Sequence, residues 1–161
     1  MENCSTQFRV VISDSKNEDF LNLIALLDID LGERNGDLQN FYSAHNKVDY
    51  IKDVVIIYSD DLAVACGAFK EYDSSTVELK RIFVKKEYRQ KGLAKLIVST
   101  LEELASSRKY KSCILETGLK QKEAISLYRK LGYEVIDNYS PYIGMENSVC
   151  MKKELNNSIE G

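Results

Sequence analysis

The stretch from Val77 to Ala105 constrains the fold of this chain most, because it contains a strand pattern, a basic loop and a helix pattern in succession. Its first part, VELKRIFV, is rich in β-branched and aromatic residues and lacks glycine and proline, which is typical of a strand. Apolar residues then recur at helical spacing and predict a helix with one buried side; they are Leu93, Leu96, Ile97, Leu101, Leu104 and Ala105.

The loop between these elements, RQKGLAK, has the composition of an anion-binding turn. The first N–H groups of a helix have no partner inside the helix, and the helix dipole adds partial positive charge there. Gly92 lets a ligand approach the backbone, Ala94 adds little bulk, and Arg89, Lys91 and Lys95 add charge. The loop therefore predicts a phosphate or pyrophosphate site. Taken alone, the loop also fits an ordinary strand-to-helix connection whose lysines are exposed to solvent and bind nothing. It lacks the residues of a P-loop and two of the three glycines of a dinucleotide fingerprint.

Length and charge narrow the class of protein. A chain of 161 residues predicts one domain, 1–161, with a polar tail at 156–161. The net charge of −3 argues against nucleic acid as a partner. No apolar run reaches the ~18 residues of a membrane span, and the first residues lack a signal core, so we expect a cytoplasmic protein. The four cysteines are scattered and the single histidine, His45, has no ligand partner at metal spacing, so reduced thiols and no metal are expected.

The remaining segments complete a mixed α/β pattern. Strands are predicted at 8–12, 54–59, 62–69, 112–116, 133–136 and 148–152, and helices at 20–27, 38–42 and 122–131. Ser13 or Ser15 is expected to cap the first helix, which Gly32 and Gly36 interrupt, and Gly132 is expected to end the last helix. The long helix between the strands at 77–84 and 112–116 predicts a parallel crossover with the anion site at its loop.

Three motifs in this order resemble those of the GNAT superfamily of acyl-CoA N-acyltransferases. The loop fits the pattern (Gln/Arg)-x-x-Gly-x-(Gly/Ala), and the two further motifs begin at Gln121 and at Ala124. The first is Gln121-x-x-Ala124, and the family has Asn at the position of Gln121. The second is Ala124-x-x-Leu127-Tyr128-x-x-x-Gly132-Tyr133, and the family has Phe at the position of Tyr133. The resemblance, spread over roughly 54–155, implies the GNAT fold. That fold is a mostly antiparallel sheet of about six or seven strands with about four helices and a splayed parallel pair at the cofactor site.

The resemblance also implies where acetyl-CoA, the co-substrate, binds. Backbone groups of Ile82, Phe83 and Val84 are expected to hold the acetyl and pantetheine arm, as a strand edge accepts an added strand. The pyrophosphate is expected on the loop and the first helical turn, at Arg89, Gln90, Lys91, Gly92, Leu93, Ala94 and Lys95. Gln121 is expected to contact the arm, although a simple helix-start residue is the alternative.

Amine acetylation needs a base for the mostly protonated amine, an acid for the departing sulfur and a donor for the oxyanion. A strand N–H near Ile82 to Val84 would serve as that donor. Glu78 is the base candidate, since it resembles the base of histone-acetylating relatives, and alternation places it on the face of Ile82 and Val84. Glu116 is the second candidate, and pairing of Glu78 with Lys80 or Arg81 is the alternative role. Tyr128 is the acid candidate, where the family commonly places a tyrosine; core packing is its alternative.

The acceptor is constrained least. Acidic residues at 28–49 could attract an amine or form a solvated surface; they are Asp28, Asp30, Glu33, Asp37 and Asp49. Tyr139 and Tyr142 could wall the acceptor pocket or pack on a second subunit of a homodimer. We therefore predict an N-acetyltransferase for a primary amine of a small molecule, amino acid or peptide. The alternatives are transfer of a longer acyl group, or a catalytically silent acyl-CoA-binding module.

Overall fold

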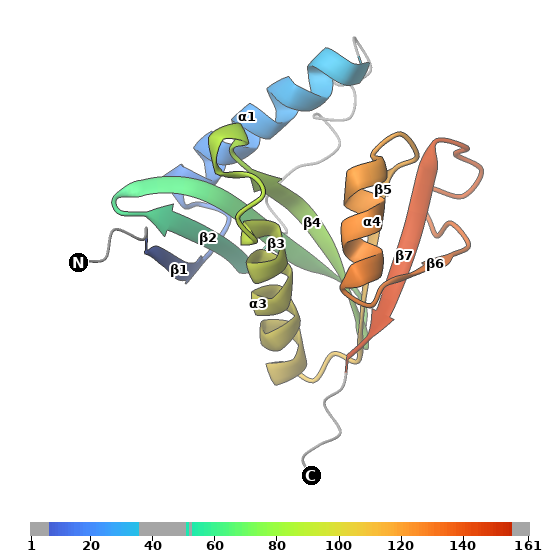
Figure 1. Ribbon diagram of the computed structural model, residues 1–161. Coiled ribbons are helices and arrows are strands. Elements are labelled where there is room, and N and C mark those ends of the chain that lie inside the picture. Colours follow the sequence, from blue (N-terminus) through green and yellow to red (C-terminus); the bar gives the residue numbers. More distant parts are fainter. Residues whose placement is uncertain (1–6, 36–50, 52, 156–161) are drawn as a thin grey trace. The chain divides into compact units, whose positions relative to one another are not determined.

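The backbone of the computed structural model, which describes residues 7–35, 51 and 53–155, follows a β-sheet with helices between its strands (Figure 1). The strands are β1 (Phe8–Ser13), β2 (Asp53–Ser59), β3 (Leu62–Asp73), β4 (Thr76–Val84), β5 (Ser112–Gly118), β6 (Glu134–Ile136) and β7 (Ser148–Glu154). The helices in the described residues are α1 (Glu18–Asn35), the short 3-10 helix η1 (Lys86–Tyr88), α3 (Leu93–Ser107) and α4 (Lys122–Lys130). The strands are hydrogen-bonded in the order β1-β2-β3-β4-β5-β7-β6.

The chain divides into two compact units, and β3, β4 and α3 each contribute residues to both. The first unit comprises Met1–Lys70 and Lys80–Leu101, and the second comprises Glu71–Leu79 and Glu102–Gly161.

In the first unit, β1, β2 and β3 form an antiparallel meander with a register shift at Ile57/Tyr58. The two-residue turn Asp60–Asp61 joins β2 to β3, as predicted, and Asp60 takes a φ of 55°. A buried apolar cluster of α1, β2, β3 and β4 side chains forms the core on one side of the sheet; it includes Phe20, Leu23, Val54, Ile56, Cys66 and Phe83.

The other side of this sheet packs closely against α3. A Cβ built on Gly67 of β3 would lie 2.4 Å from Cγ2 of Ile97 and 3.2 Å from a side-chain carbon of Leu101. Any residue larger than glycine would therefore force Ile97 or the backbone to shift. Burial on both sides explains why β2 and most of β3 are apolar runs rather than alternating ones.

In the second unit, β4 pairs with β5 in parallel, from Thr76↔Ser112 to Glu78↔Ile114. The parallel crossover predicted through α3 is therefore confirmed. β5 and β6 both pair antiparallel with β7. Gly132 follows α4 with a φ of 102°, and the N–H of Tyr133 donates to the carbonyl of Tyr128 at 2.9 Å, so the helix ends where predicted.

Several local predictions for the N-terminal region need correction. The cap of α1 is Asn17, whose Oδ1 accepts from the N–H of Phe20 at 3.0 Å, and not Ser13 or Ser15. The helix also continues through Gly32 to Asn35, since one glycine weakens a helix without ending it. The expected helix at 38–42 lies outside the described residues.

Strand β4 departs from the regular alternation assumed in the sequence. Arg81 has a φ of 59°, in the left-handed region, although it lies inside the strand. Alternation is therefore interrupted at Arg81, and the face of Glu78 does not follow from the faces of Ile82 and Val84.

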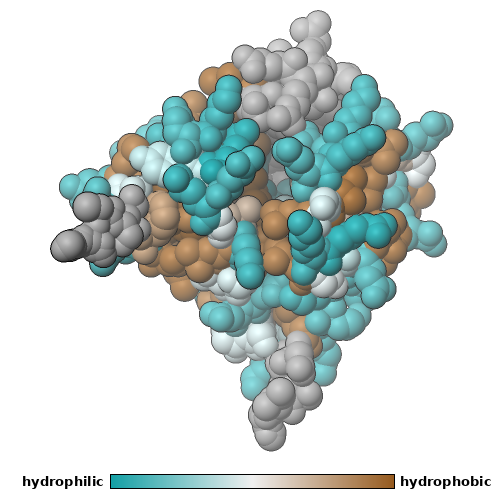
Figure 2. All heavy atoms as spheres, in the orientation of Figure 1, coloured by the Kyte–Doolittle hydropathy of each residue, from teal (hydrophilic) through white to brown (hydrophobic). Residues whose placement is uncertain are grey.

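The exposed apolar side chains are distributed over many elements; they include Val10, Ile12, Leu26, Leu62, Val135 and Ile143. On the face drawn in Figure 2, apolar surface is interspersed with hydrophilic side chains. Within the residues that can be described, no helix has the length and apolar character needed to cross a bilayer.

Candidate active site

In the first unit, a tight connection joins the end of β4 to α3. After Val84 the chain makes the single turn of η1, and the Nε of Arg89 donates back to the carbonyl of Val84 at 3.0 Å. Gln90 then takes a φ of 64°. The Arg89 side chain, predicted to hold pyrophosphate, is thereby anchored at the end of the strand.

Gly92 heads α3 with a φ of 81°, and a Cβ built on it would meet no atom within 4 Å. Its carbonyl accepts the first helical hydrogen bond, from Leu96 N–H at 3.0 Å. Lys91 and Lys95 are exposed, and no acidic residue lies in the first turn of α3. An open, positively charged helix N-terminus of this kind suits a phosphate group.

The loop and helix residues predicted for this site differ in exposure. Leu93 is buried, Ala94 is half-buried and Gln90 is exposed. Leu93 therefore serves the core with its side chain, and only its backbone is suited to an anion.

The end of β4 offers backbone rather than side-chain chemistry. The Phe83 side chain belongs to the apolar cluster with α1, while Ile82 and Val84 are half-buried. The N–H of Lys85 is already bonded to the carbonyl of Val64 at 2.9 Å. The Val84 carbonyl accepts from Arg89 and, with two lone pairs, keeps capacity for one more donor.

In the second unit, Glu78 is a buried carboxylate with a phenol partner. It is 3% exposed, and the hydroxyl of Tyr139 donates to its Oε2 at 2.8 Å. Burial, and then the charge of Glu78, raise the pKa of the Tyr139 phenol. The ring of Tyr139 makes edge-on contacts with Tyr72 and Tyr142, at centroid distances of 5.2 and 5.5 Å. The sequence suggested that Tyr139 walls the acceptor pocket or packs on a second subunit, and it did not reveal this hydrogen bond.

The second base candidate lies on the same sheet face as the first. Glu78 is level with Ile114 in the parallel ladder, and Glu116 follows Ile114 by two residues, so alternation turns both carboxylates to one side. Glu116 accepts from the hydroxyl of Ser148 at 2.7 Å. Cys150 pairs with Glu116 across the ladder, and the pKa of its thiol is raised by burial and by both carboxylates.

Tyr128 of α4 is buried, as its place in the helix stripe required. It is 8% exposed, and burial raises the pKa of its phenol to about 12. Its ring meets that of Tyr133 edge-on at 5.9 Å. No hydrogen bond of its hydroxyl is found within the described part of the chain. A buried phenol without a partner is unusual and leaves a donor available to a bound group.

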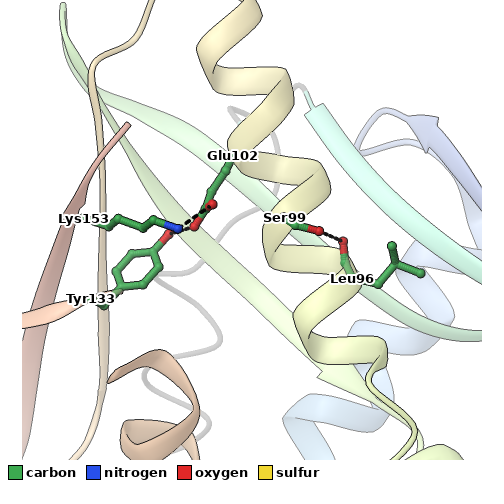
Figure 3. Close-up of polar contacts among 5 residues, drawn as sticks. All are labelled: Leu96, Ser99, Glu102, Tyr133 and Lys153. Carbon is green, nitrogen blue, oxygen red and sulfur yellow. Dashed lines mark hydrogen bonds and ion pairs between the residues drawn. The ribbon is translucent and has the colours of Figure 1, made fainter. Parts of the chain in front are cut away.

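Beside Tyr128, a polar network fixes Tyr133. The Tyr133 hydroxyl donates to Oε2 of Glu102 at 2.8 Å, and Lys153 Nζ lies 3.0 Å from Oε1 of the same carboxylate (Figure 3). Figure 3 also shows the hydroxyl of Ser99 bonded to the carbonyl of Leu96, one turn back along α3. The network was not predicted, because its members are far apart in the sequence, in α3, in the connection between α4 and β6, and in β7.

Gln121, which the sequence predicted to contact the pantetheine arm, lies at the N-cap of α4. Its side chain makes no capping hydrogen bond there. The described cysteines Cys66, Cys113 and Cys150 are buried free thiols. The described residues contain no group of three or more side chains able to hold a metal ion.

A family model and the similar proteins of known sequence all point to the same family, the GNAT acetyltransferases. The family model "Acetyltransferase (GNAT) family" matches residues 21–133. "Probable N-acetyltransferase 14" from Xenopus tropicalis is 31% identical over 108 residues, which are 66% of this chain and 52% of that protein. The uncharacterized N-acetyltransferase YsnE from Bacillus subtilis is 35% identical over 98 residues, which are 60% of this chain and 64% of YsnE. The chain thus matches less than two thirds of either relative's length.

Solved structures agree on the fold. A provisionally named acyl-CoA N-acyltransferase from Klebsiella pneumoniae has a TM-score of 0.77 at 27% identity, covering 92% of this chain and 98% of that one. A Bacillus subtilis acetyltransferase in complex with CoA has a TM-score of 0.67 at 18% identity, covering 92% and 99%. The mixed, mostly antiparallel sheet with one parallel pair that the sequence predicted is therefore confirmed as the GNAT fold.

Proposed function

Because this chain belongs to the GNAT acetyltransferase family, we propose that it transfers the acetyl group of acetyl-CoA to a primary amine of a small molecule, amino acid or peptide. Relatives named as N-acetyltransferases support an acyltransferase activity. The observation that carries the proposal is the N-terminus of α3, where an open, positive-φ glycine stands among exposed basic residues with no acidic side chain in the first turn.

The residues at this N-terminus fit the pyrophosphate of coenzyme A. Backbone N–H groups from Gly92 to Lys95 would bind its oxygens, and Arg89, Lys91 and Lys95 would balance its charge. Gly92 has room for a close approach, since nothing lies within 4 Å of the added Cβ position. Backbone groups of Ile82, Phe83 and Val84 would hold the acyl end. When bound, acetyl-CoA supplies an activated thioester.

In the second unit, Glu78 is proposed as the general base. A buried carboxylate held by the Tyr139 hydroxyl has a fixed orientation, which a base needs if it is to accept a proton from one direction. Glu116 is the alternative base, since it lies on the same face and is itself held by Ser148. A water molecule could carry the proton to either carboxylate.

Tyr128 is proposed as the general acid. Its hydroxyl is protonated near neutral pH, as an ordinary phenol is, and burial raises its pKa further, to about 12. It lacks a hydrogen-bond partner among the described residues. A proton held by an unpartnered donor is available to a leaving thiolate. Gln121 is proposed to contact the pantetheine arm from the start of α4.

Thermal unfolding with acetyl-CoA, coenzyme A or ATP tests the cofactor assignment. At a ligand concentration ~100 times the dissociation constant, binding adds ~2.7 kcal/mol to the unfolding free energy. We expect a shift with acetyl-CoA and coenzyme A and none with ATP. No shift with any of the three would refute the site at α3.

Thiol release during acetyl transfer to a panel of primary amines then tests the activity. We expect turnover with at least one amine. Binding without turnover would favour the silent acyl-CoA-binding module, and faster turnover with a longer acyl-CoA would favour the other alternative. Glu78→Gln and Tyr128→Phe are each expected to lower kcat by about a hundredfold or more.

A further inference from the structure

Arg81 holds an unusual backbone conformation just before the strand end that is proposed to bind the acyl group. Its φ of 59° lies in the left-handed region, which costs free energy for any residue with a Cβ. All residues of β4 except Arg81 have a negative φ. Such a conformation persists only where the surrounding structure holds it in place.

The Arg81 side chain is held by α1. Its Nη1 lies 2.7 Å from Oδ1 of Asp28, and the two side chains are 7% and 28% exposed. Because the pair is partly buried, water and salt screen it less than a surface pair, and removing one partner leaves a partly buried charge behind. In the sequence, Asp28 belongs to a group of acidic residues that could attract an amine or form a solvated surface. In the fold it also pairs with Arg81.

The backbone around Arg81 is held from both sides of the sheet. The Sγ of Cys66 donates to the carbonyl of Arg81 at 3.5 Å on the α1 side. On the α3 side, Ile82 packs at Gly67, with its Cγ1 3.2 Å from the position of an added Cβ. Phe83 then returns to the cluster with α1. The directions of these residues therefore depend on the torsion angles at Arg81.

We propose that the Arg81–Asp28 ion pair holds the left-handed conformation of Arg81 and thereby positions the backbone of Ile82, Phe83 and Val84 for the acyl group. Both are positioning residues, acting through the strand without touching the substrate. This inference rests on the proposed function, because it takes the end of β4 as the acyl-binding element.

Two substitutions at one position separate the conformation from the ion pair. Arg81→Ala and Arg81→Gly both remove the guanidinium, but glycine adopts a positive φ readily and alanine does not. We expect Arg81→Ala to lower kcat/KM by about tenfold to a hundredfold, the loss that a misplacement of about 1 Å causes. Arg81→Gly is expected to stay within about threefold of the wild type. A purely electrostatic or packing role would make the two variants equal.

Asp28→Asn tests the other partner and remains informative if Arg81→Ala does not fold. Alone it should lower kcat/KM in the direction of Arg81→Ala, and in an Arg81→Gly background it should add nothing. Lys109→Gly is the matched control, since Lys109 is an exposed residue with a φ of 75° that follows α3. It should leave kcat/KM unchanged.

Two results would overturn the inference. One is an Arg81→Gly variant no more active than Arg81→Ala; the other is an Asp28→Asn cost that persists in the Arg81→Gly background. Amide hydrogen exchange at residues 82–84 of the free protein gives a readout independent of activity. Asp28→Asn should speed this exchange in the wild type and not in Arg81→Gly. If the wild type binds no acetyl-CoA, the proposed function fails, while the exchange result still decides the role of the ion pair.

Discussion

Gly92→Ala is expected to weaken acetyl-CoA binding well beyond its effect on stability, and Gly144→Ala provides a matched control. Gly92 and Gly144 have φ values of 81° and 83°, and at neither would an added Cβ meet an atom within 4 Å. Neither substitution creates a clash, so both carry only the backbone cost of a left-handed residue, about 1–2 kcal/mol. For a chain of this size, that corresponds to a fall in Tm of about 2–8 °C.

The two glycines differ in what they are expected to face. Gly92 precedes α3, where a phosphate is proposed to approach the backbone, and Gly144 lies in the connection between β6 and β7. A methyl group at Gly92 would occupy the space needed for close approach. We expect the dissociation constant of Gly92→Ala for acetyl-CoA to rise at least about tenfold, which corresponds to a loss of about 1.4 kcal/mol in binding free energy. Gly144→Ala should leave that constant unchanged.

Thermal unfolding without ligand measures the shared stability cost, and titration calorimetry with acetyl-CoA measures the difference. We expect equal losses of Tm and unequal losses of affinity for the two variants. Equal affinities for the two variants would refute the idea that open space at Gly92 is where the ligand binds. A much larger fall in Tm for one variant would show that the backbone costs are not matched.

Three further predictions follow from buried groups. Tyr128→Phe removes a buried hydroxyl that has no hydrogen-bond partner among the described residues, so its Tm should be equal to or above that of the wild type in thermal unfolding, even though kcat is expected to fall. With a phenol pKa of about 12 in the fold against 10.0 in the unfolded chain, only the unfolded state loses this proton between pH 10 and 12. Tyr128 should therefore contribute a fall of about 2–3 kcal/mol in the unfolding free energy over that range, in addition to the contributions of other buried phenols such as Tyr139; in denaturant titrations, the total fall should be smaller for Tyr128→Phe than for the wild type. Gly67→Ala should lower stability by about 1–3 kcal/mol, because its Cβ would lie 2.4 Å from Ile97, whereas Gly118→Ala, whose nearest neighbour is at 3.5 Å, should cost less in the same assay.

The sequence determined the order of elements and the loop at the proposed cofactor site. Apolar periodicity and β-branched runs located α3, α4 and all seven strands to within a few residues. Gly132 takes the positive φ that its place just past a helix end suggested. These features depend on hydrogen bonds and side-chain spacing within a few residues, and such local rules can be read along a chain.

Only the tertiary structure decided which side chains hold the candidate active-site residues. Asp28 and Arg81 are 53 residues apart, and Glu78 and Tyr139 are 61 apart. The left-handed conformation of Arg81 also broke the alternation from which the face of Glu78 had been inferred. Nothing near these residues in sequence specifies their partners, because strand register and packing bring them together only once the sheet has formed.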